Sequence, residues 1–276
     1  MSALPSPSGP LADPTGFETV DEHDPDYFVR FLDARTEIPG EARVKQLIMN
    51  ELRLRDGLAV LDVGSGTGTD TCEVARSVTP NGSVVGLDRS ARMVEEARRR
   101  ASELGLAAEF IEGDAAELPF PDATFDRSRA ERVLAFLPDP APAVRELVRV
   151  TRPDGLVVVS EIDTGTIFLT GPDPGVPDTL LDALASGIPN PRVGRQLHRQ
   201  FVEAGLVDVR CLPHVVLNSP AFLRVVFSGR LDQLVAEGVV TAAKAEAFWA
   251  EQDRGEREGW LCTGVTCFTV VGRKSA

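Results

Sequence analysis

The chain has 276 residues and a formal net charge of −13. This length suits one large α/β domain with an insertion that covers a substrate. The acidic balance argues against nucleic acid as the main partner, because phosphate binding needs a basic surface. The sequence therefore favours a protein that acts on a small molecule.

The cysteine spacing and the N-terminal segment indicate a cytoplasmic protein without membrane insertion. The four cysteines form no Cys-x-x-Cys pair, so neither a metal site nor a disulfide framework is predicted. Residues 1–16 lack the basic start and apolar block of a signal peptide. We expect a disordered tail there and a single domain over residues 17–276. No run of about 18 apolar residues, the length that spans a bilayer, occurs in the chain.

Apolar runs alternate with helical patterns along the chain, which predicts an α/β fold with a doubly wound, largely parallel sheet. Ser90 and Asp139 precede helical patterns and are predicted to cap them. The predicted strands cover residues 58–63, 83–87, 107–111, 125–129, 155–161, 206–212 and 264–271, and the predicted helices cover 69–78, 90–104, 140–151 and 194–204.

Two helical segments lie outside this alternation. Residues 17–55 precede the first strand, and residues 218–258 separate strands six and seven. The Pro-rich residues 165–178 are expected to form an irregular connection. Since ligands of open α/β sheets bind beyond the carboxyl ends of the strands, we expect residues 17–35, 163–190 and 218–258 to form a lid and an acceptor pocket there.

A glycine-rich turn follows the first strand, and an acidic residue closes the second. Gly64, Gly66 and Gly68 alternate directly after an apolar run, and Asp88 ends the next one. Glycines let a backbone approach a ligand closely, and an acid in this place can accept hydrogen bonds from both hydroxyls of a ribose. The pattern predicts an adenosine-type cofactor. The dinucleotide fingerprint G-x-G-x-x-G is not met, because Thr69 stands where its third small residue belongs.

Several motifs, taken in order, resemble those of the class I S-adenosylmethionine (SAM) methyltransferases. The glycine turn is similar to motif I, residues 88–97 to the D-x-S-x-x-M-x-x-x-A motif, and residues 112–126 to the G-D-A-x-x-L-P-F stretch. The resemblance covers roughly residues 25–273 and includes the ubiquinone/menaquinone-type and actinomycete small-molecule enzymes. It implies a Rossmann-like sheet of seven strands with the last strand antiparallel.

The same resemblance implies SAM as the cofactor and S-adenosyl-L-homocysteine as its product. Asp88 would bind the ribose, Met93 the adenine face, Asp114 the adenine amino group, and the Ala115 amide a ring nitrogen. The implied cofactor-binding residues are Asp62, Gly64, Ser65, Gly66, Gly68, Asp88, Arg89, Met93, Gly113, Asp114, Ala115, Ala130 and Glu131.

Methyl transfer from a sulfonium is an in-line displacement that needs positioning, no metal, and a base only if the acceptor loses a proton. The base candidates are His23, Glu161 and His198. Each has an alternative reading: a solvated surface histidine for His23, a loop or capping role for Glu161, and a structural role for His198.

One departure bears on the acceptor. Many relatives have a histidine in a V-L-x-H-L motif where this chain has Phe136. The change favours an apolar or aromatic acceptor, and the Arg- and Ala-rich composition indicates a high-GC bacterial gene of secondary metabolism. Two alternatives stay open for the function: a SAM-binding protein of this fold that guides cyclisation or isomerisation, and a nicotinamide-dependent oxidoreductase. The apolar N-terminal helices could also pair two subunits as a homodimer.

Overall fold

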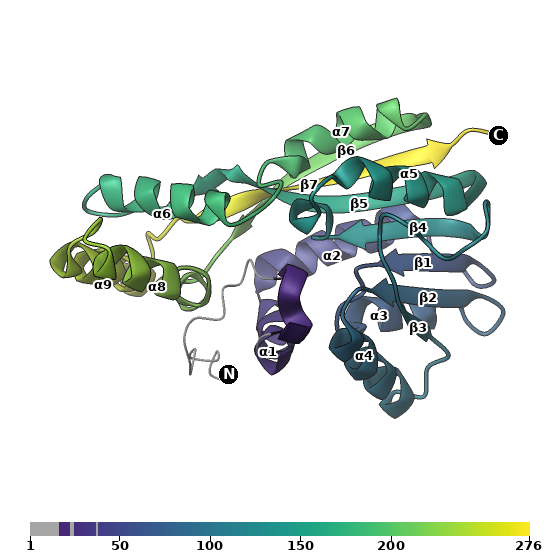
Figure 1. The fold of residues 1–276 in the computed structure, drawn as a ribbon, viewed down its shortest axis with the longest axis horizontal. Coiled ribbons are helices and arrows are strands. Elements are labelled where there is room, and N and C mark those ends of the chain that lie inside the picture. Colours follow the sequence, from purple (N-terminus) through teal and green to yellow (C-terminus); the bar gives the residue numbers. More distant parts are fainter. Residues whose placement is uncertain (1–16, 23–24, 37) are drawn as a thin grey trace.

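The computed structural model describes residues 17–22, 25–36 and 38–276, so the predicted tail over residues 1–16 lies outside the described part. A sheet of seven strands runs through the centre in the order β3-β2-β1-β4-β5-β7-β6 (Figure 1). The strands are β1 Ala59–Val63, β2 Ser83–Asp88, β3 Glu109–Glu112, β4 Phe125–Glu131, β5 Thr151–Phe168, β6 Leu206–Leu217 and β7 Gly264–Lys274.

The predicted fold class is confirmed. β1 to β5 pair in parallel, and β7 runs antiparallel to both β5 and β6. The helices and 3-10 turns are η1 Phe17–Glu22, α1 Pro25–Thr36, α2 Pro39–Leu52, α3 Thr69–Val78, α4 Ala91–Glu103, η2 Leu134–Phe136, α5 Pro140–Val150, α6 Gly175–Ser186, α7 Val193–Glu203, α8 Pro220–Ala236 and α9 Ala242–Glu258.

Both faces of the sheet are covered by helices. On one face Ile48 of α2 packs against Val158 of β5. On the other face, Leu147 of α5 and Leu197 of α7 belong to the same hydrophobic cluster as Val157, the residue before Val158 in β5. Adjacent residues of one strand point to opposite faces, so a run of consecutive valines is the pattern that a strand covered on both sides requires.

Two helix starts are capped as the sequence predicts. The Ser90 hydroxyl accepts from the Met93 amide at 3.1 Å, and the Asp139 carboxylate accepts from the Ala141 amide at 3.0 Å. These caps satisfy amides that have no partner within the helix. The cap at Ser90 also fixes where α4 begins, directly after the acidic end of β2.

The expectation of an irregular connection over residues 165–178 is wrong at both ends. β5 continues to Phe168, and α6 begins at Gly175. β6 also extends past its predicted end, to Leu217. Both extensions pair with Gly264 of β7, which satisfies backbone groups where the local sequence no longer alternates.

The extended strands lead to α6, α8 and α9, which group beyond one end of the sheet (Figure 1). Residues 218–258, predicted as a helical insertion, form α8 and α9. Among the described helices, none combines the length and the apolar character needed to cross a bilayer.

Candidate cofactor and acceptor site

A cavity of about 800 Å³ lies at the carboxyl ends of β1, β2, β4 and β5. One part is lined by the glycine turn, the end of β2 and the stretch after β3. The other part is lined by apolar side chains from η1, α1, η2 and α8. The volume is within the range of small-molecule sites in proteins, about 300–1,000 Å³.

The glycines of the turn are required by the backbone conformation and by packing within the protein, besides the room that they leave for a ligand. Gly64, Gly66 and Gly68 all have positive φ angles, of 70°, 52° and 77°, and glycine adopts this conformation without steric cost. A side chain at Gly64 would lie 2.1 Å from Val133, and one at Gly68 would lie 2.7 Å from Ala97. At those two positions the space is taken by neighbouring protein atoms.

Asp88 holds the turn and faces the cavity. Its Oδ2 accepts from the Gly66 amide at 2.8 Å, and its Oδ1 accepts from the Ser90 amide at 3.0 Å. Burial raises the pKa of this carboxyl above its ordinary value, while the two amides oppose the shift. Each carboxylate oxygen offers a second lone pair, so both can still accept from the hydroxyls of a ribose.

The structure brings most of the predicted cofactor residues to one cavity. Only Gly68 and Ala130 do not line it: Gly68 packs against α4, and Ala130 is buried in the core. The residues that do line it are Asp62, Gly64, Ser65, Gly66, Asp88, Arg89, Met93, Gly113, Asp114, Ala115 and Glu131.

A layer of buried charges lies under the cavity. Arg129 has almost no exposed surface and contacts Asp62 at 3.3 Å, Asp70 at 3.3 Å and Glu131 at 2.7 Å. Burial raises the pKa of Asp62 to about 6 in spite of Arg129. Burial acts in the same direction on Asp70, but Arg129 and Lys45 outweigh it and lower the pKa of that carboxyl.

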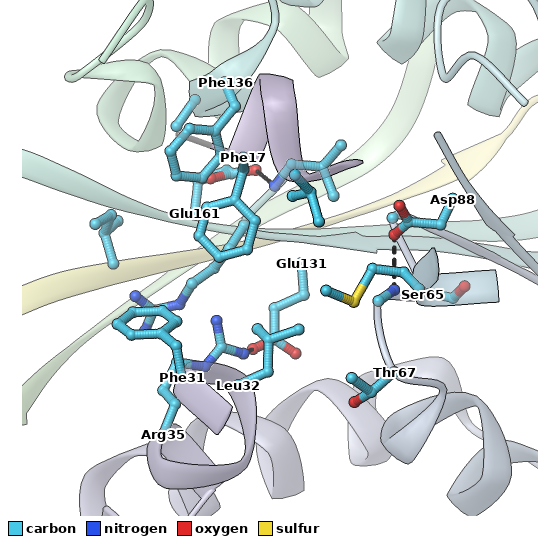
Figure 2. A pocket seen from close by; sticks show the side chains of 18 of the residues that line it. Phe17, Phe31, Leu32, Arg35, Ser65, Thr67, Asp88, Glu131, Phe136 and Glu161 are labelled. Carbon is cyan, nitrogen blue, oxygen red and sulfur yellow. Dashed lines mark hydrogen bonds and ion pairs between the residues drawn. The ribbon is translucent and has the colours of Figure 1, made fainter. Parts of the chain in front are cut away.

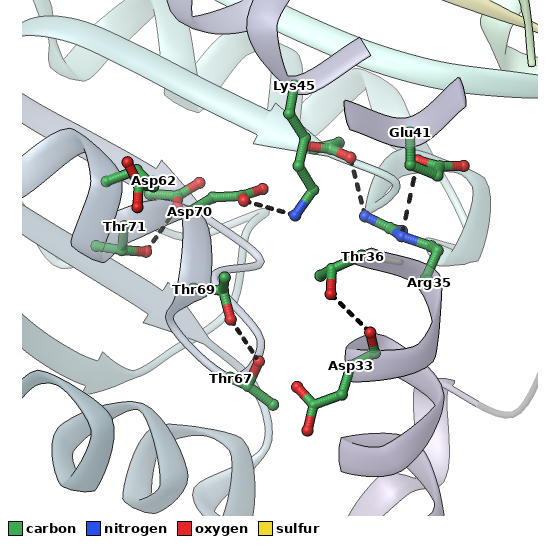
Figure 3. Close-up of polar contacts among 12 residues, drawn as sticks. Asp33, Arg35, Thr36, Glu41, Lys45, Asp62, Thr67, Thr69, Asp70 and Thr71 are labelled. Atoms are coloured by element: carbon green, nitrogen blue, oxygen red, sulfur yellow. Dashed lines mark hydrogen bonds and ion pairs between the residues drawn. The ribbon is translucent and has the colours of Figure 1, made fainter. Parts of the chain in front are cut away.

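Two cations from the N-terminal helices line the cavity and were not predicted. Lys45 of α2 reaches Asp70 at 2.6 Å, and Arg35 of α1 reaches Glu131 at 2.9 Å (Figure 3). A positional signal does exist, because Arg35 follows Phe28 and Phe31 by seven and four residues and so shares their helix face.

Of the three base candidates, the structure places one, Glu161, at the cavity. His23 lies outside the described residues. His198 is exposed on α7 and does not line the cavity, so the structure does not support it as a catalytic residue. Glu161 lines the cavity and is fully buried, with Oε1 accepting from the amides of Val133 at 2.7 Å and Leu134 at 2.6 Å.

Aromatic rings from separate segments line the apolar part of the cavity (Figure 2). Phe17 of η1 lies 5.1 Å from Phe136 of η2 and 5.9 Å from Phe31 of α1, measured between ring centroids. Phe31 in turn lies 6.2 Å from Phe222 of α8. Helices on both sides of the cavity therefore meet at one aromatic cluster, formed by Phe17, Phe31, Phe136 and Phe222.

Fold and site together define an α/β protein that binds a nucleoside cofactor at the switch point of its sheet, beside a second, apolar chamber. A family model described as a methyltransferase domain matches residues 54–186. Demethylmenaquinone methyltransferase of Staphylococcus aureus is 34% identical over 123 residues, which is 45% of this chain and 51% of that enzyme. Residues 54–186 therefore match a methyltransferase domain, and the chain is similar to class I SAM-dependent methyltransferases, whose cofactor is SAM.

Two further proteins resemble the chain. An uncharacterised 37.1 kDa protein in transposon TN4556 of Streptomyces fradiae is 37% identical over 186 residues, covering 67% of this chain and 54% of that protein. The solved structure of the [4+2]-cyclase SpnF shares 26% identity with a TM-score of 0.55, covering 85% of this chain and 80% of that chain. The chain spans about half the length of the curated relatives it matches.

Proposed function

We propose that the protein transfers the methyl group of SAM to a small acceptor with an apolar or aromatic body. The observation that carries the proposal is the single cavity, which joins a cofactor-type wall to an aromatic chamber. SAM with its ribose at Asp88 and its adenine at Met93 would direct its methyl group toward that chamber. Arg35 and Lys45, which pair with Glu131 and Asp70, are the proposed contacts of its carboxylate.

The chemistry asks little of the protein beyond alignment. The acceptor atom forms a bond to the methyl carbon while the carbon–sulfur bond breaks, and sulfur keeps the electron pair as a neutral thioether. Holding the three atoms in line can contribute about 7–11 kcal/mol in ideal systems. A proton must leave only if the acceptor is a hydroxyl or a protonated amine.

The acceptor chamber is proposed to have its lid in η1, α1 and α8. Phe222 and Val226 of α8 line the cavity together with Phe17 and Leu32. Replacing residues 218–258 with the matching segment of a relative should change acceptor preference and leave the affinity for S-adenosylhomocysteine unchanged. The idea fails if cofactor affinity collapses while acceptor preference persists.

The direct test incubates the protein with methyl-labelled SAM and a panel of aromatic acceptors, beginning with 1-naphthol and 2-naphthylamine. We expect label in at least one aromatic product, with a mass gain of one methylene unit. A secondary metabolite is the proposed natural acceptor, and the net charge of −13 argues against nucleic acid. Failure to bind S-adenosylhomocysteine in calorimetry would remove the basis of the proposal.

A second candidate function is cyclisation or isomerisation guided by bound SAM. Two observations favour it: the likeness to the [4+2]-cyclase SpnF, and a chamber lined by Phe17, Phe31 and Phe136. Fold alone does not decide between the two reactions. A product isomeric with the substrate, formed without loss of label from SAM, would favour cyclisation.

A further inference from the structure

The loop between β4 and α5 joins the two halves of the cavity. It begins after Glu131, the last residue of β4, at the cofactor part, and it carries Phe136 at the aromatic part. Arg132 between them has a positive φ of 56°, a conformation that costs energy in a residue with a side chain and persists only when the surroundings hold it. The contacts that hold this loop therefore decide how both halves are placed.

Val133 is fixed by the glycine turn. Its side chain fills the space that a side chain at Gly64 would need. The amide of Arg132 donates to the carbonyl of Ser160 on β5 at 3.0 Å. The cofactor side of the loop is thus held by β1 and β5.

Glu161 fixes the other side. Its Oε1 accepts from the amides of Val133 and Leu134, which are the first amides of η2 and have no partner within that single turn. The negative charge of the carboxylate also lies at the N-terminal, partly positive end of the turn, which is a favourable electrostatic interaction. The η2 turn carries Phe136, whose ring meets Phe17 of the N-terminal segment.

The remaining carboxylate oxygen is shielded from solvent, although the residue borders the cavity. Oε2 has no exposed surface and no hydrogen-bond partner, and the whole side chain is 0% exposed. Burial raises the pKa of Glu161 to about 7, and the Leu134 and Val133 amides and Arg132 oppose the rise, while Glu131 adds to it. A pKa near 7 would suit a base, but a base must reach the proton it removes.

We infer that Glu161 is a positioning residue: it holds η2 so that Phe136 forms one wall of the acceptor chamber. This inference rests on the proposed function for its link to the acceptor. It replaces the sequence-based expectation that Glu161 is a catalytic residue. It also gives a role to a carboxyl that is fully buried within β5.

The experiment compares Glu161→Gln with Glu161→Leu. Glutamine keeps an oxygen for the two amides but cannot act as a base, whereas leucine removes both capacities. Asp163→Asn is the control for loss of a buried carboxylate, because Asp163 is fully buried on the same strand, pairs with Arg195 and does not line the cavity. The probes are S-adenosylhomocysteine for binding and 1-naphthol for methyl transfer.

Hydrogen exchange of residues 131–137 gives a readout that needs no acceptor. We expect Glu161→Gln to keep the protection of the Val133 and Leu134 amides, and Glu161→Leu to speed their exchange about tenfold or more. The Gln variant should retain kcat and the pH profile of the parent. The Leu variant, if it folds, should raise the KM for 1-naphthol about tenfold with an unchanged Kd for S-adenosylhomocysteine.

Two outcomes overturn the inference. A Gln variant with intact amide protection but a kcat about a hundredfold lower would make Glu161 the base. Unchanged exchange in both variants would mean that Glu161 does not hold η2. If 1-naphthol is not methylated, the exchange readout still decides the positioning role, so the two proposals fail separately.

Discussion

At the scale of single residues, buried carboxyls dominate the site. Asp62, Asp88 and Glu161 all line the cavity, and burial raises the pKa of each. Asp88 already accepts two backbone amides, so it is held in place before a ligand arrives. Such preorganisation lowers the ordering cost of binding.

Asp88→Ala should weaken binding of S-adenosylhomocysteine about tenfold or more, since a hydrogen bond to a charged group contributes about 1.5–3 kcal/mol. The substitution also frees the Gly66 amide and loosens the glycine turn. Isothermal titration calorimetry measures the effect. Asp178→Ala, an exposed acid on α6, is the control and should leave Kd unchanged. An unaltered Kd for Asp88→Ala would contradict the cofactor assignment.

The raised pKa values of Asp62, about 6, and Glu161, about 7, make stability depend on pH in a defined direction. Both groups bind protons more tightly in the folded chain than in the unfolded one. Their contribution is complete below the unfolded pKa values near 4 and is lost as pH rises through 6 and 7.

Because of these two groups, we expect the urea concentration at the unfolding midpoint to decrease as the pH is raised from 5 to 8. Glu161→Gln should flatten the upper part of that slope, because glutamine does not titrate. Denaturation monitored by circular dichroism at a series of pH values provides the measurement. A slope that is the same in the Gln variant would exclude Glu161 as its source.

At the scale of elements, the N-terminal segment is tied to α4 by charged side chains. The Asp21 carboxylate accepts from the Ser90 hydroxyl at 2.5 Å and the Ala91 amide at 2.9 Å. Asp33 of α1 pairs with Arg100 at 2.7 Å. Because the same segment carries Phe17 and Leu32 into the cavity, these contacts connect α4, the helix of Met93, to the aromatic cluster.

Asp33→Asn should loosen α1 without unfolding the chain, since Asp33 is half-exposed and ion pairs that water reaches contribute only about 0–1 kcal/mol. Faster hydrogen exchange over residues 25–36 is the expected result, and added salt should produce part of the same change in the parent protein. Glu203→Gln removes a more exposed pair within α7, with Arg199, and serves as the control for loss of an ion pair that joins no two elements. Equal hydrogen exchange over residues 25–36 in the two variants would mean that the Asp33–Arg100 pair does not hold α1 against α4.

Much of this element arrangement was predictable. The central strands and their helices follow from apolar runs and caps such as Ser90, which act locally. The cofactor wall follows from the glycine turn and Asp88. What could not be predicted depends on distant pairing: the extension of β5 to Phe168 needs β7, and the role of Glu161 needs the amides of η2.

At the scale of the whole molecule, the negative net charge of the protein is opposite in sign to the sulfonium charge of SAM. The chain carries −13, and the sulfonium gives SAM one more positive charge than S-adenosylhomocysteine. A protein field of this sign attracts cations and speeds their encounter, and salt screens it. The acidic composition thus bears on the rate of cofactor capture.

We expect the association rate of SAM to fall as ionic strength rises, while that of S-adenosylhomocysteine changes much less. The two ligands differ chemically only in the methyl group on sulfur and its positive charge, so each controls for the other. Stopped-flow fluorescence can follow both, using the two tryptophans of the chain. Equal salt dependence for the two ligands would rule out steering by net charge.

The place of β7 has a consequence for biosynthesis. In the sheet β6 borders on β7 alone, and β7 also completes the exposed side of β5. The ribosome makes β6 first, then α8 and α9, and only afterwards β7, the strand that pairs with both β5 and β6. A nascent chain can assemble the glycine turn and its parallel strands early, but the β5 edge of the sheet stays unpaired until β7 has been made.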